Sequence, residues 1–462
     1  MEHNWEGNGF ERLEAMVFRL TLLIIRQALE GILEDMDKYL AVVRDKSRYE
    51  AEEIEERVLD TLVGTIRFKR RSYRDRETGR RVHLLDEKLK IKGYQRVSEG
   101  LVKVAVSLAA AGPSYRNARD RLKELIGEEI LSHEGIRQLV LKTSEVIKEA
   151  ALEKTSLQRR EVLFIEADGL WTGKQGKKNK RGKKKKEETK FAVVHEGWRP
   201  RYAGSREYET ITTFRYIQTK GSREDFWVGL YGKLAEAYAL GTTMVVINGD
   251  GAEWIRKGTD YFPCAIYQYD RFHISREVAK ALKWDEGLKK EALQALRDND
   301  LGGLMQVLDG AIIKADKKHK GAVERVRDTV RSDWEHIIDY RLRLKALGYN
   351  CETFRGLGSG ESNVGKFKSR TRGRSWSSEG LEALGNVLFK LVDGSLGIYT
   401  SCIRSRFQEH TAKIVATGAE VVKKAVLQCG AGVKKGHFPC LERGTEGYAQ
   451  LFRQILKEGF VV

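Results

Sequence analysis

Apolar segments that suit β-strands follow one another along residues 160–275, and their order constrains the fold more than any other feature of the sequence. The segments "EVLFIEADGLW", "TKFAVVHEGW" and "YETITTFRYIQT" predict three strands, since they are rich in β-branched and aromatic residues. A helix at about 222–240, the strand "TTMVVINGDG" and the strand "AIYQYDRFHI", which leads into a further helix, come next. The sequence therefore predicts a core of mixed α/β class.

Two aspartates lie in strands that this order brings together. Three strands, a helix, a strand, a helix and a further strand is the order of a ribonuclease-H-like fold with a mixed five-stranded sheet, in which the first and fourth strands are neighbours. Asp168 lies in the first strand and Asp250 ends the fourth. Because two carboxylates repel each other and are costly to bury, a divalent cation between them is favourable. Oxygen ligands suit Mg²⁺ or Mn²⁺, and two such ions roughly 3.5–4 Å apart can promote attack at a phosphodiester.

Asp250 has a second interpretation that involves no metal. The stretch "DGAE" also fits a capping box, with Asp250 at the N-cap of a helix and Glu253 three residues later. In the metal interpretation, the flanking residues Gly249 and Gly251 would let a cation and a phosphate approach the backbone. The residues themselves leave both interpretations open.

A third carboxylate is predicted at Glu361, in the segment "GSGESNVGKFKSRTRGR". An acid among cations fits a metal ligand beside a phosphate backbone, although a surface glutamate that offsets basic neighbours has the same pattern. Asp270 is a rival because it also ends a strand. The cations that follow Glu361 are predicted to contact DNA: Lys366, Lys368, Arg370, Arg372 and Arg374.

The charge of the chain favours a polyanionic partner. Its 84 Lys and Arg residues exceed its 66 Asp and Glu residues, and the net charge of +18 favours nucleic acid over a merely solvated basic surface. A basic β-hairpin is predicted near residues 62–85, around the turn signal "DRETGR". A lysine-rich segment at 174–186 lacks apolar residues and predicts a mobile loop that either grips phosphates or stays solvated. The DNA contacts predicted in these two segments are Lys69, Arg70, Arg71, Lys183, Lys184, Lys185 and Lys186.

Helical patterns flank this core on both sides. Residues 10–60 predict a helix whose apolar run "MVFRLTLLII" is too short to span a bilayer and is interpreted as a buried face. Ser114 and Ser132 are predicted to cap two short helices, which fit either a DNA-reading helix-turn-helix or an ordinary helical hairpin. The five cysteines form no CxxC pair and support neither a zinc ribbon nor a disulfide framework, as expected for a cytosolic protein.

These patterns predict seven regions along the chain. They are an N-terminal helical region (1–60), a basic hairpin (61–95), a helix-turn-helix-like DNA-binding region (96–158), the first part of the ribonuclease-H-like core (159–283), a large helical insertion (284–349), the last part of the core with the third carboxylate (350–400) and a C-terminal helical region (401–462).

The order of five motifs resembles that of the ISLre-type insertion-sequence transposases, which are DDE enzymes distantly related to the Mutator-like group. The motifs are "IEADG", "KFAVVHEGW", "INGDGAEWI", "YDRFHISRE" and "GSGES", and the likeness extends over most of the chain, including the basic hairpin. The resemblance implies a ribonuclease-H-like domain that uses Mg²⁺ to cut and join DNA. It makes Asp168 and Asp250 the two aspartates and Glu361 the glutamate. Asp270 and His273 match a family motif without an assigned chemical role, and the lysine-rich segment departs from the family pattern.

The function expected from the sequence is therefore transposition of an insertion sequence. The enzyme would cleave at the element ends with two Mg²⁺ or Mn²⁺ ions and transfer the 3′-hydroxyl into target DNA. Its expected partners are double-stranded element ends, target DNA and further copies of itself in the DNA complex, at the nucleoid of the cytoplasm and without a membrane. The alternatives are a related nuclease without strand transfer and a catalytically dead, transposase-derived DNA-binding protein.

Overall fold

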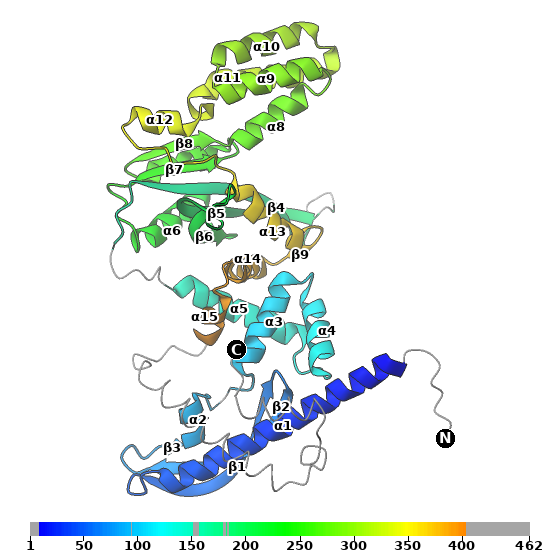
Figure 1. The fold of residues 1–462 in the computed structure, drawn as a ribbon, viewed down its shortest axis with the longest axis vertical. Coiled ribbons are helices and arrows are strands. Elements are labelled where there is room, and N and C mark those ends of the chain that lie inside the picture. The colour runs from blue at the N-terminus through cyan, green and yellow to red at the C-terminus, as the bar shows by residue number, and fades with distance from the viewer. Residues whose placement is uncertain (1–8, 94, 151–156, 179–181, 183, 403–462) are drawn as a thin grey trace. The chain divides into compact units, whose positions relative to one another are not determined.

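The computed structural model describes residues 9–93, 95–150, 157–178, 182 and 184–402 (Figure 1). Contacts divide the chain into two compact units. The first unit comprises Met1–Thr143 and Gly394–Val462, and the second comprises Ser144–Asp393. The predicted C-terminal helical region falls outside the described residues from 403 onward.

The first unit combines helices with a small antiparallel sheet of order β1-β2-β3. Its core lies between the C-terminal half of α1 and β2, where Leu33 and Met36 pack against Ile66 and Phe68. The elements are α1 (Gly9–Val43), β1 (Tyr49–Thr61), β2 (Gly64–Asp75), β3 (Arg81–Val82), α2 (Leu84–Leu89), α3 (Glu99–Ala111), α4 (Tyr115–Ile126), α5 (His133–Glu149), which crosses into the second unit, and α15 (Leu396–Cys402).

The predicted helix over residues 10–60 is wrong beyond Val43, because Tyr49–Thr61 forms strand β1. Glutamate is a good helix former, so local propensity favoured a helix across this glutamate-rich segment. Pairing with the arginine-rich strand β2 outweighs that preference, and Arg67 forms a cross-strand ion pair of 3.3 Å with Glu56. The hairpin therefore turns between Thr61 and Gly64, and "DRETGR" joins β2 to β3.

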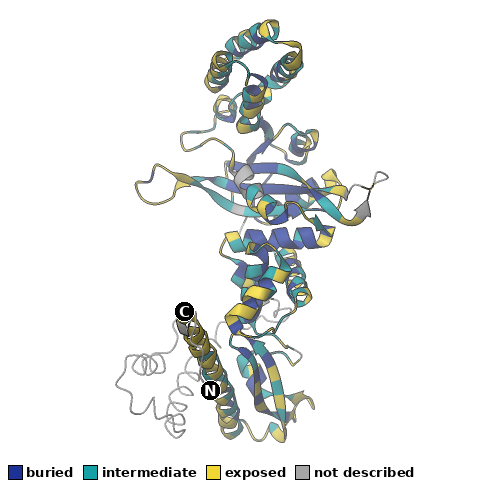
Figure 2. Cartoon of the chain, turned by 90° about the vertical axis from the view of Figure 1, so that its right-hand side faces the viewer, coloured by how far each residue is buried: buried dark blue, intermediate teal, exposed yellow. Residues whose placement is uncertain are grey.

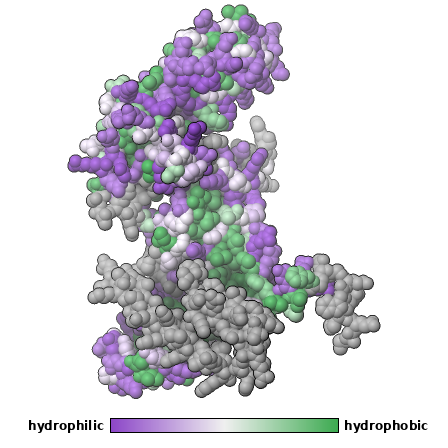
Figure 3. Space-filling view, viewed as in Figure 1, coloured by the Kyte–Doolittle hydropathy of each residue, from purple (hydrophilic) through white to green (hydrophobic). Residues whose placement is uncertain are grey.

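The N-terminal half of α1 is exposed, contrary to its interpretation as a buried face. Phe10, Met16, Phe18 and Leu23 are each at least 48% exposed, and Figure 3 shows hydrophobic side chains on this part of the helix. The helix makes its core contacts with β2 from Leu29 onward, so its earlier turns extend past the strand. No helix in the described part of the chain is long and apolar enough to cross a membrane.

Both predicted caps in the helical pair α4 and α5 are confirmed. Ser114 Oγ accepts a hydrogen bond of 3.0 Å from the amide of Asn117, and Ser132 Oγ accepts one of 3.0 Å from Gly135. These bonds satisfy amide groups that the first turn of a helix leaves without intrahelical partners.

The second unit is built around a mixed six-stranded sheet of order β6-β5-β4-β7-β8, with β9 paired to β4 (Figure 1). Strands β4, β5 and β6 are antiparallel, whereas β4, β7 and β8 are parallel. The strands are β4 (Val162–Lys178), β5 (Lys184–Pro200), β6 (Tyr208–Gln218), β7 (Met244–Gly249), β8 (Ala265–Tyr269) and β9 (Ser375–Trp376).

Helices cover both faces of this sheet. Leu163 and Ile165 of β4 belong to a core that extends into the helical block, whereas Val162 and Phe164 pack with Tyr340 on the opposite face. Figure 2 shows buried residues in the middle of this sheet and intermediate or exposed residues toward the ends of its long strands. The helices are α6 (Arg223–Ala235), α7 (Glu253–Arg256), the 3₁₀ turn η1 (Lys257–Tyr261), α8 (Arg271–Ala281), α9 (Glu286–Asp298), α10 (Leu301–Lys314), α11 (Lys317–Ile337), α12 (Tyr340–Ala346), α13 (Ser359–Thr371) and α14 (Ser378–Val392).

The strands predicted in residues 160–275 and the helices predicted in residues 284–349 are confirmed. The lysine-rich loop is wrong at both ends of its segment, and residues 179–181 and 183 in its middle lie outside the described residues. Strands β4 and β5 continue into the segment predicted as a loop, and Gly173 pairs with Lys186. Backbone pairing needs no apolar side chain, so the absence of such residues did not prevent strand formation.

Candidate active site

Three buried polar residues form a row across the parallel strands. Glu166 of β4 is in register with Asn248 of β7, which is in register with Gln268 of β8. Their exposed fractions are 3%, 2% and 1%. The row lies at the carboxyl ends of β7 and β8 and within the longer β4. A buried polar row is costly unless its groups are hydrogen-bonded, so it marks a specialised region of the sheet.

Three aspartates follow this row at the same spacing: Asp168 lies within β4, whereas Asp250 and Asp270 come directly after the ends of β7 and β8. Asp168, Asp250 and Asp270 each lie two residues beyond a member of the row, and side chains two apart along a strand share a face. Neighbouring strands are about 4.8 Å apart. Asp168 and Asp250 therefore each lie two residues beyond a paired member of the row, Asp168 half-buried within β4 and Asp250 exposed in the turn after β7.

The turn that carries Asp250 is held by a buried tyrosine. The Tyr267 hydroxyl donates to the carbonyl of Gly249 at 3.0 Å and accepts from the amide of Gly251 at 2.9 Å. Burial raises the pKa of Tyr267 above its usual range, so the hydroxyl keeps the proton that it donates. The two bonds hold the backbone on both sides of Asp250.

The capping-box interpretation of Asp250 is wrong. Helix α7 begins after Ala252, and no side chain caps it. Asp250 instead accepts a hydrogen bond of 3.2 Å from the amide of Ala252, which is a local turn contact. The exposed carboxylate of Asp250 therefore caps no helix in the described part of the chain.

The two glycines beside Asp250 are explained by packing within the protein. A Cβ atom at Gly249 would lie 2.6 Å from Ile255 Cγ2, and one at Gly251 would lie 2.6 Å from the ring of Tyr269. Gly251 also has a φ of +93°, which L side chains rarely adopt. The glycines therefore shape the turn, so the close approach of a ligand is not needed to explain them.

Asp270 caps the helix that follows β8. Its Oδ1 accepts from the amides of Phe272 at 2.8 Å and His273 at 3.1 Å, and its Oδ2 accepts from Asn248 Nδ2 at 2.8 Å. Burial pushes the pKa of Asp270 upward, but hydrogen bonds from His273 and Asn248 outweigh it and leave the pKa below its usual value. The hydrogen bond to Asp270 raises the pKa of His273. Both residues serve the junction between β8 and α8.

Glu361 lies in the first turn of α13, and its side chain is outside the described part of the structure. The start of this helix is tied to β4, because the amide of Gly358 donates to Glu166 Oε2 at 2.9 Å. The other oxygen of Glu166 lies 3.2 Å from Nε2 of His195, which is fully buried and stacks on Phe164. Sequence analysis missed both Glu166 and His195, although Glu166 lies two residues before Asp168 on the same face of the strand.

The three cations predicted as DNA contacts in the hairpin differ in exposure. Lys69 is exposed, whereas Arg70 is 5% exposed and pairs with Asp86. Burial lowers the pKa of Arg70 to about 10. Arg71 Nη1 lies 2.5 Å from Asp37 Oδ2. Arg70 is therefore buried within the first unit, where it is not accessible to a DNA phosphate in solution.

The predicted cations of the second unit mostly face solvent. Lys185, Lys186, Lys366, Arg372 and Arg374 are exposed, and Lys368 is half-buried. Arg370 is an exception, since it is 5% exposed and its guanidinium lies 5.0 Å from the centre of the Trp376 ring. Lys183 and the side chain of Lys184 fall outside the described part.

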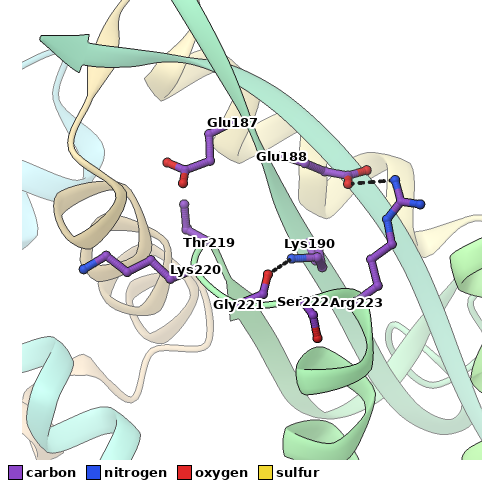
Figure 4. Close-up of a pocket in the computed structure, with 8 residues that line it drawn as sticks. All are labelled: Glu187, Glu188, Lys190, Thr219, Lys220, Gly221, Ser222 and Arg223. Carbon is purple, nitrogen blue, oxygen red and sulfur yellow. Dashed lines mark hydrogen bonds and ion pairs between the residues drawn. The ribbon is translucent and has the colours of Figure 1, made fainter. Parts of the chain in front are cut away.

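A separate cavity of about 340 Å³ lies where β5 meets the start of α6 (Figure 4). Lys190 Nζ donates to the carbonyl of Gly221 at 3.1 Å, and Arg223 lies 3.3 Å from Glu188. Lys190 thus contacts the backbone, and Arg223 and Glu188 contact each other. The polar groups of this cavity therefore serve the structure of the protein.

The described side chains include some of the oxygen ligands that the predicted metal site needs. Among them, no three His, Cys, Asp or Glu residues are gathered so that they could hold a metal ion. Asp168 and Asp250 supply the hard oxygen donors that Mg²⁺ and Mn²⁺ prefer. The predicted third donor is Glu361, whose helix begins against β4.

Comparison with known proteins identifies relatives along most of the chain. A family model described as "Uncharacterised protein family (UPF0236)" matches residues 3–400. UPF0236 protein TTE2489 of Caldanaerobacter subterraneus subsp. tengcongensis is 25% identical over 387 residues, which cover 83% of this chain and 78% of the relative. The UPF0236 protein in the vanSb 3′ region of Streptococcus gallolyticus is 28% identical over 397 residues, which cover 84% of each chain.

Two further findings complete the comparison. Another relative from Caldanaerobacter has a name that joins eleven locus labels, so relatives of this chain occur in many copies in one genome. The solved "Drosophila P element transposase strand transfer complex" aligns with 74% of this chain and 95% of its own, at 10% identity and a TM-score of 0.25. That likeness is too weak to support an argument about the fold.

Proposed function

The chain belongs to the uncharacterised protein family UPF0236, and we propose that this member is a DDE transposase of an insertion sequence. The observation that carries the proposal is the pairing of Glu166 with Asn248 on the neighbouring parallel strands β4 and β7, since Asp168 and Asp250 each come two residues after that buried pair. Such a pair suits divalent cations and phosphodiester chemistry.

The topology of the sheet supports a ribonuclease-H-like fold. In chain order, the first three strands of the sheet are antiparallel neighbours, and the fourth and fifth continue it in parallel on the other side of the first. Helix α6 lies between the third and fourth of these strands in sequence. This arrangement agrees with the strand order that the sequence predicts for the fold, and it makes the strands of Asp168 and Asp250 neighbours.

The proposed site uses three carboxylates. Asp168 and Asp250 would hold two Mg²⁺ or Mn²⁺ ions, and Glu361 would complete the set from α13. When bound, the ions would stabilise the attacking and leaving oxygens of a phosphodiester. The Tyr267 hydrogen bonds hold the turn of Asp250, and Glu166 holds the start of α13. These contacts hold the backbone of the Asp250 turn and of the residue before α13 in place before DNA arrives.

The reaction would proceed in two displacements at phosphorus. Water would first cleave the phosphodiester at an element end and free a 3′-hydroxyl. That hydroxyl would then displace a 3′-oxygen in target DNA, so one bond forms as another breaks and no external energy source is needed. The exposed cations of the second unit would bind the phosphates of both DNA segments, and joining of two ends would require at least a dimer.

The test uses the purified full-length chain with a labelled element end, taken from the DNA that flanks its gene, and a target plasmid. We expect cleavage and joined products with Mg²⁺ and neither with EDTA. Asp168→Asn and Asp250→Asn should each reduce the rate by roughly 100- to 1000-fold or more. Asp300→Asn is the matched control, because Asp300 caps α10 and asparagine caps equally well.

The outcomes separate the proposed transposase from its alternatives. Metal-dependent cleavage without joined products would replace the transposase with a nuclease that uses the same carboxylates. Tight DNA binding with neither activity, in a protein shown to be folded, would identify a dead DNA-binding relative. Equal activity in Asp250→Asn and Asp300→Asn would overturn the assignment of the site.

A further inference from the structure

A second cavity of the second unit lies just beyond Asp168 on β4. It has a volume of about 680 Å³, which is the size of a small-molecule site. Residues from β4, β5, α13 and the turn after α13 line it: Leu170, Trp171, Thr172, Gly173, Lys186, Gly365, Lys368, Ser369, Thr371, Arg372, Gly373 and Arg374. One wall is therefore the strand that carries Asp168.

The cavity exists because two distant segments pair. Strand β9 runs parallel to β4, with Gly173 opposite Ser375 and Lys174 opposite Trp376. A Cβ atom at Gly173 would lie 3.2 Å from the carbonyl oxygen of Arg374, so glycine permits this close approach. The pairing holds Arg372 and Arg374 beside β4.

The lining combines an exposed aromatic ring with cations that pair with no described residue. Trp171 is 56% exposed, which is unusual for a large aromatic side chain next to a strand core. Lys186, Lys368, Arg372 and Arg374 form no ion pair with any described residue. Exposed aromatic rings among free cations are the features by which proteins bind single-stranded nucleic acid, because bases stack on the rings and phosphates pair with the cations.

We propose that this cavity holds an unpaired nucleotide of single-stranded DNA, with its base stacked on Trp171 and its phosphates on the surrounding cations. A base inside a duplex has both faces covered, so stacking on the indole selects an unpaired one. Trp171 lies three residues beyond Asp168, or about 10 Å along the strand, and this odd separation places the two side chains on opposite faces of β4. The inference rests on the proposed function in one respect, the source of the single-stranded DNA. Under that function, it comes from DNA that has opened next to the cleaved phosphodiester.

The test measures binding by the full-length chain in EDTA, so it does not depend on cleavage. Fluorescence anisotropy compares a labelled oligothymidylate with an abasic strand of the same length and charge. We expect the wild-type protein to bind the abasic strand roughly 10- to 100-fold more weakly. Trp171→Ala should lower the affinity for oligothymidylate by a similar factor and should no longer distinguish the two strands.

Matched variants separate stacking from charge and from folding. Tyr202→Ala removes another exposed aromatic ring, which does not line the cavity, and should leave both affinities unchanged. Trp171→Phe keeps a ring and should retain the preference for bases. The double variant Arg372→Gln, Arg374→Gln should weaken both strands equally, because each carries the same phosphates.

The inference and the proposed function fail in different ways. If Trp171→Ala, folded as judged by its melting temperature, bound oligothymidylate as tightly as Tyr202→Ala, the stacking site would be overturned whatever the cleavage assay shows. Equal wild-type affinity for both strands would overturn it as well. Loss of cleavage in Asp250→Asn bears on the carboxylates and leaves this result unaffected.

Discussion

The β1–β2 hairpin and the cavity beside Asp168 are both rich in arginine and lysine, but they use these residues in opposite ways. At the hairpin, the arginines form ion pairs with acidic side chains. Arg48, just before β1, pairs with Asp75 at 3.0 Å, and Arg76, just after β2, pairs with Glu50 at 3.3 Å. At the cavity, Arg372 and Arg374 are exposed and pair with no described residue.

The difference shows that a count of basic residues does not measure the positive charge available to a partner. Strand β1 contains the run "YEAEEIEER", whose carboxylates face the arginines of β2 and β3. A cation that is already paired gains little from a phosphate, because the new contact replaces an existing one. Free cations release counterions when they bind DNA and contribute to affinity.

The largest expected effect is on the stability of the first unit. Arg70→Ala leaves the carboxylate of Asp86, which is 5% exposed, without its cation. Removing one partner of a buried pair costs about 3–5 kcal/mol. Urea unfolding should show this loss in the free energy of unfolding. Arg74→Ala, which removes an exposed arginine from the same strand, should stay within about 0.5 kcal/mol of wild type.

Replacing both members of the buried pair sharpens this prediction. Arg70→Met with Asp86→Leu should recover most of the lost stability, since apolar residues of similar volume often replace a buried ion pair at little cost. If the double variant were as unstable as Arg70→Ala, apolar packing could not replace the pair, and the ion pair itself would be required at this position.

The next effect is on DNA affinity at the cavity. Arg372→Gln with Arg374→Gln should weaken duplex binding about tenfold near physiological salt and reduce the log–log salt slope by about 1.8, or about 0.9 per phosphate contact. The unfolding free energy should not change, because both side chains are exposed. An unchanged salt slope would show that these arginines do not contact phosphates.

A gain of binding is expected when the hairpin loses its acids. Glu52 and Glu53 both pair with Arg81. Glu52→Gln with Glu53→Gln should raise duplex affinity by roughly two- to fivefold at low salt, because the hairpin then repels phosphates less. Electrophoretic mobility shift at two salt concentrations measures the gain, and the same gain at high salt would contradict an electrostatic cause.

The smallest effect is expected at Lys69, the exposed member of the predicted trio in the hairpin. If Lys69 binds one phosphate, Lys69→Gln should weaken duplex binding by about two- to threefold and reduce the salt slope by about 0.9. An effect as large as that of the Arg372 and Arg374 double variant would remove the contrast between the two regions.

Much of the second unit was predictable from the sequence because each strand carries its own apolar pattern. The order of the strands correctly made the strand of Asp168 a neighbour of the strand that precedes Asp250, whereas the meeting of the two carboxylates stays a prediction. The role of Asp250 required the structure, since "DGAE" fits a capping box equally well and the observed α7, whose N-cap is Ala252, begins two residues too late for it. Asp270 was recognised as a strand end but not as the cap of α8.

Features that depend on partners distant in sequence were not predictable. Strand β1 is rich in glutamate, which is a good helix former, and it forms a strand because it pairs with β2. The extension of β4 and β5 into the lysine-rich segment has the same origin. Glu166 gave no signal of its own, because its hydrogen-bond partner Gly358 lies 192 residues away.

That separation has a consequence for the order in which the chain folds. A ribosome synthesises Asp168 and Asp250 long before Gly358 and the β9 residues Ser375 and Trp376, and contacts between such distant residues form slowly. A nascent or truncated chain that ends before α13 therefore has two aspartates but lacks the helix that carries Glu361. Under the proposed function, incomplete chains would be unable to cut the genome that encodes them, and breakage of DNA would begin after the polypeptide is nearly complete.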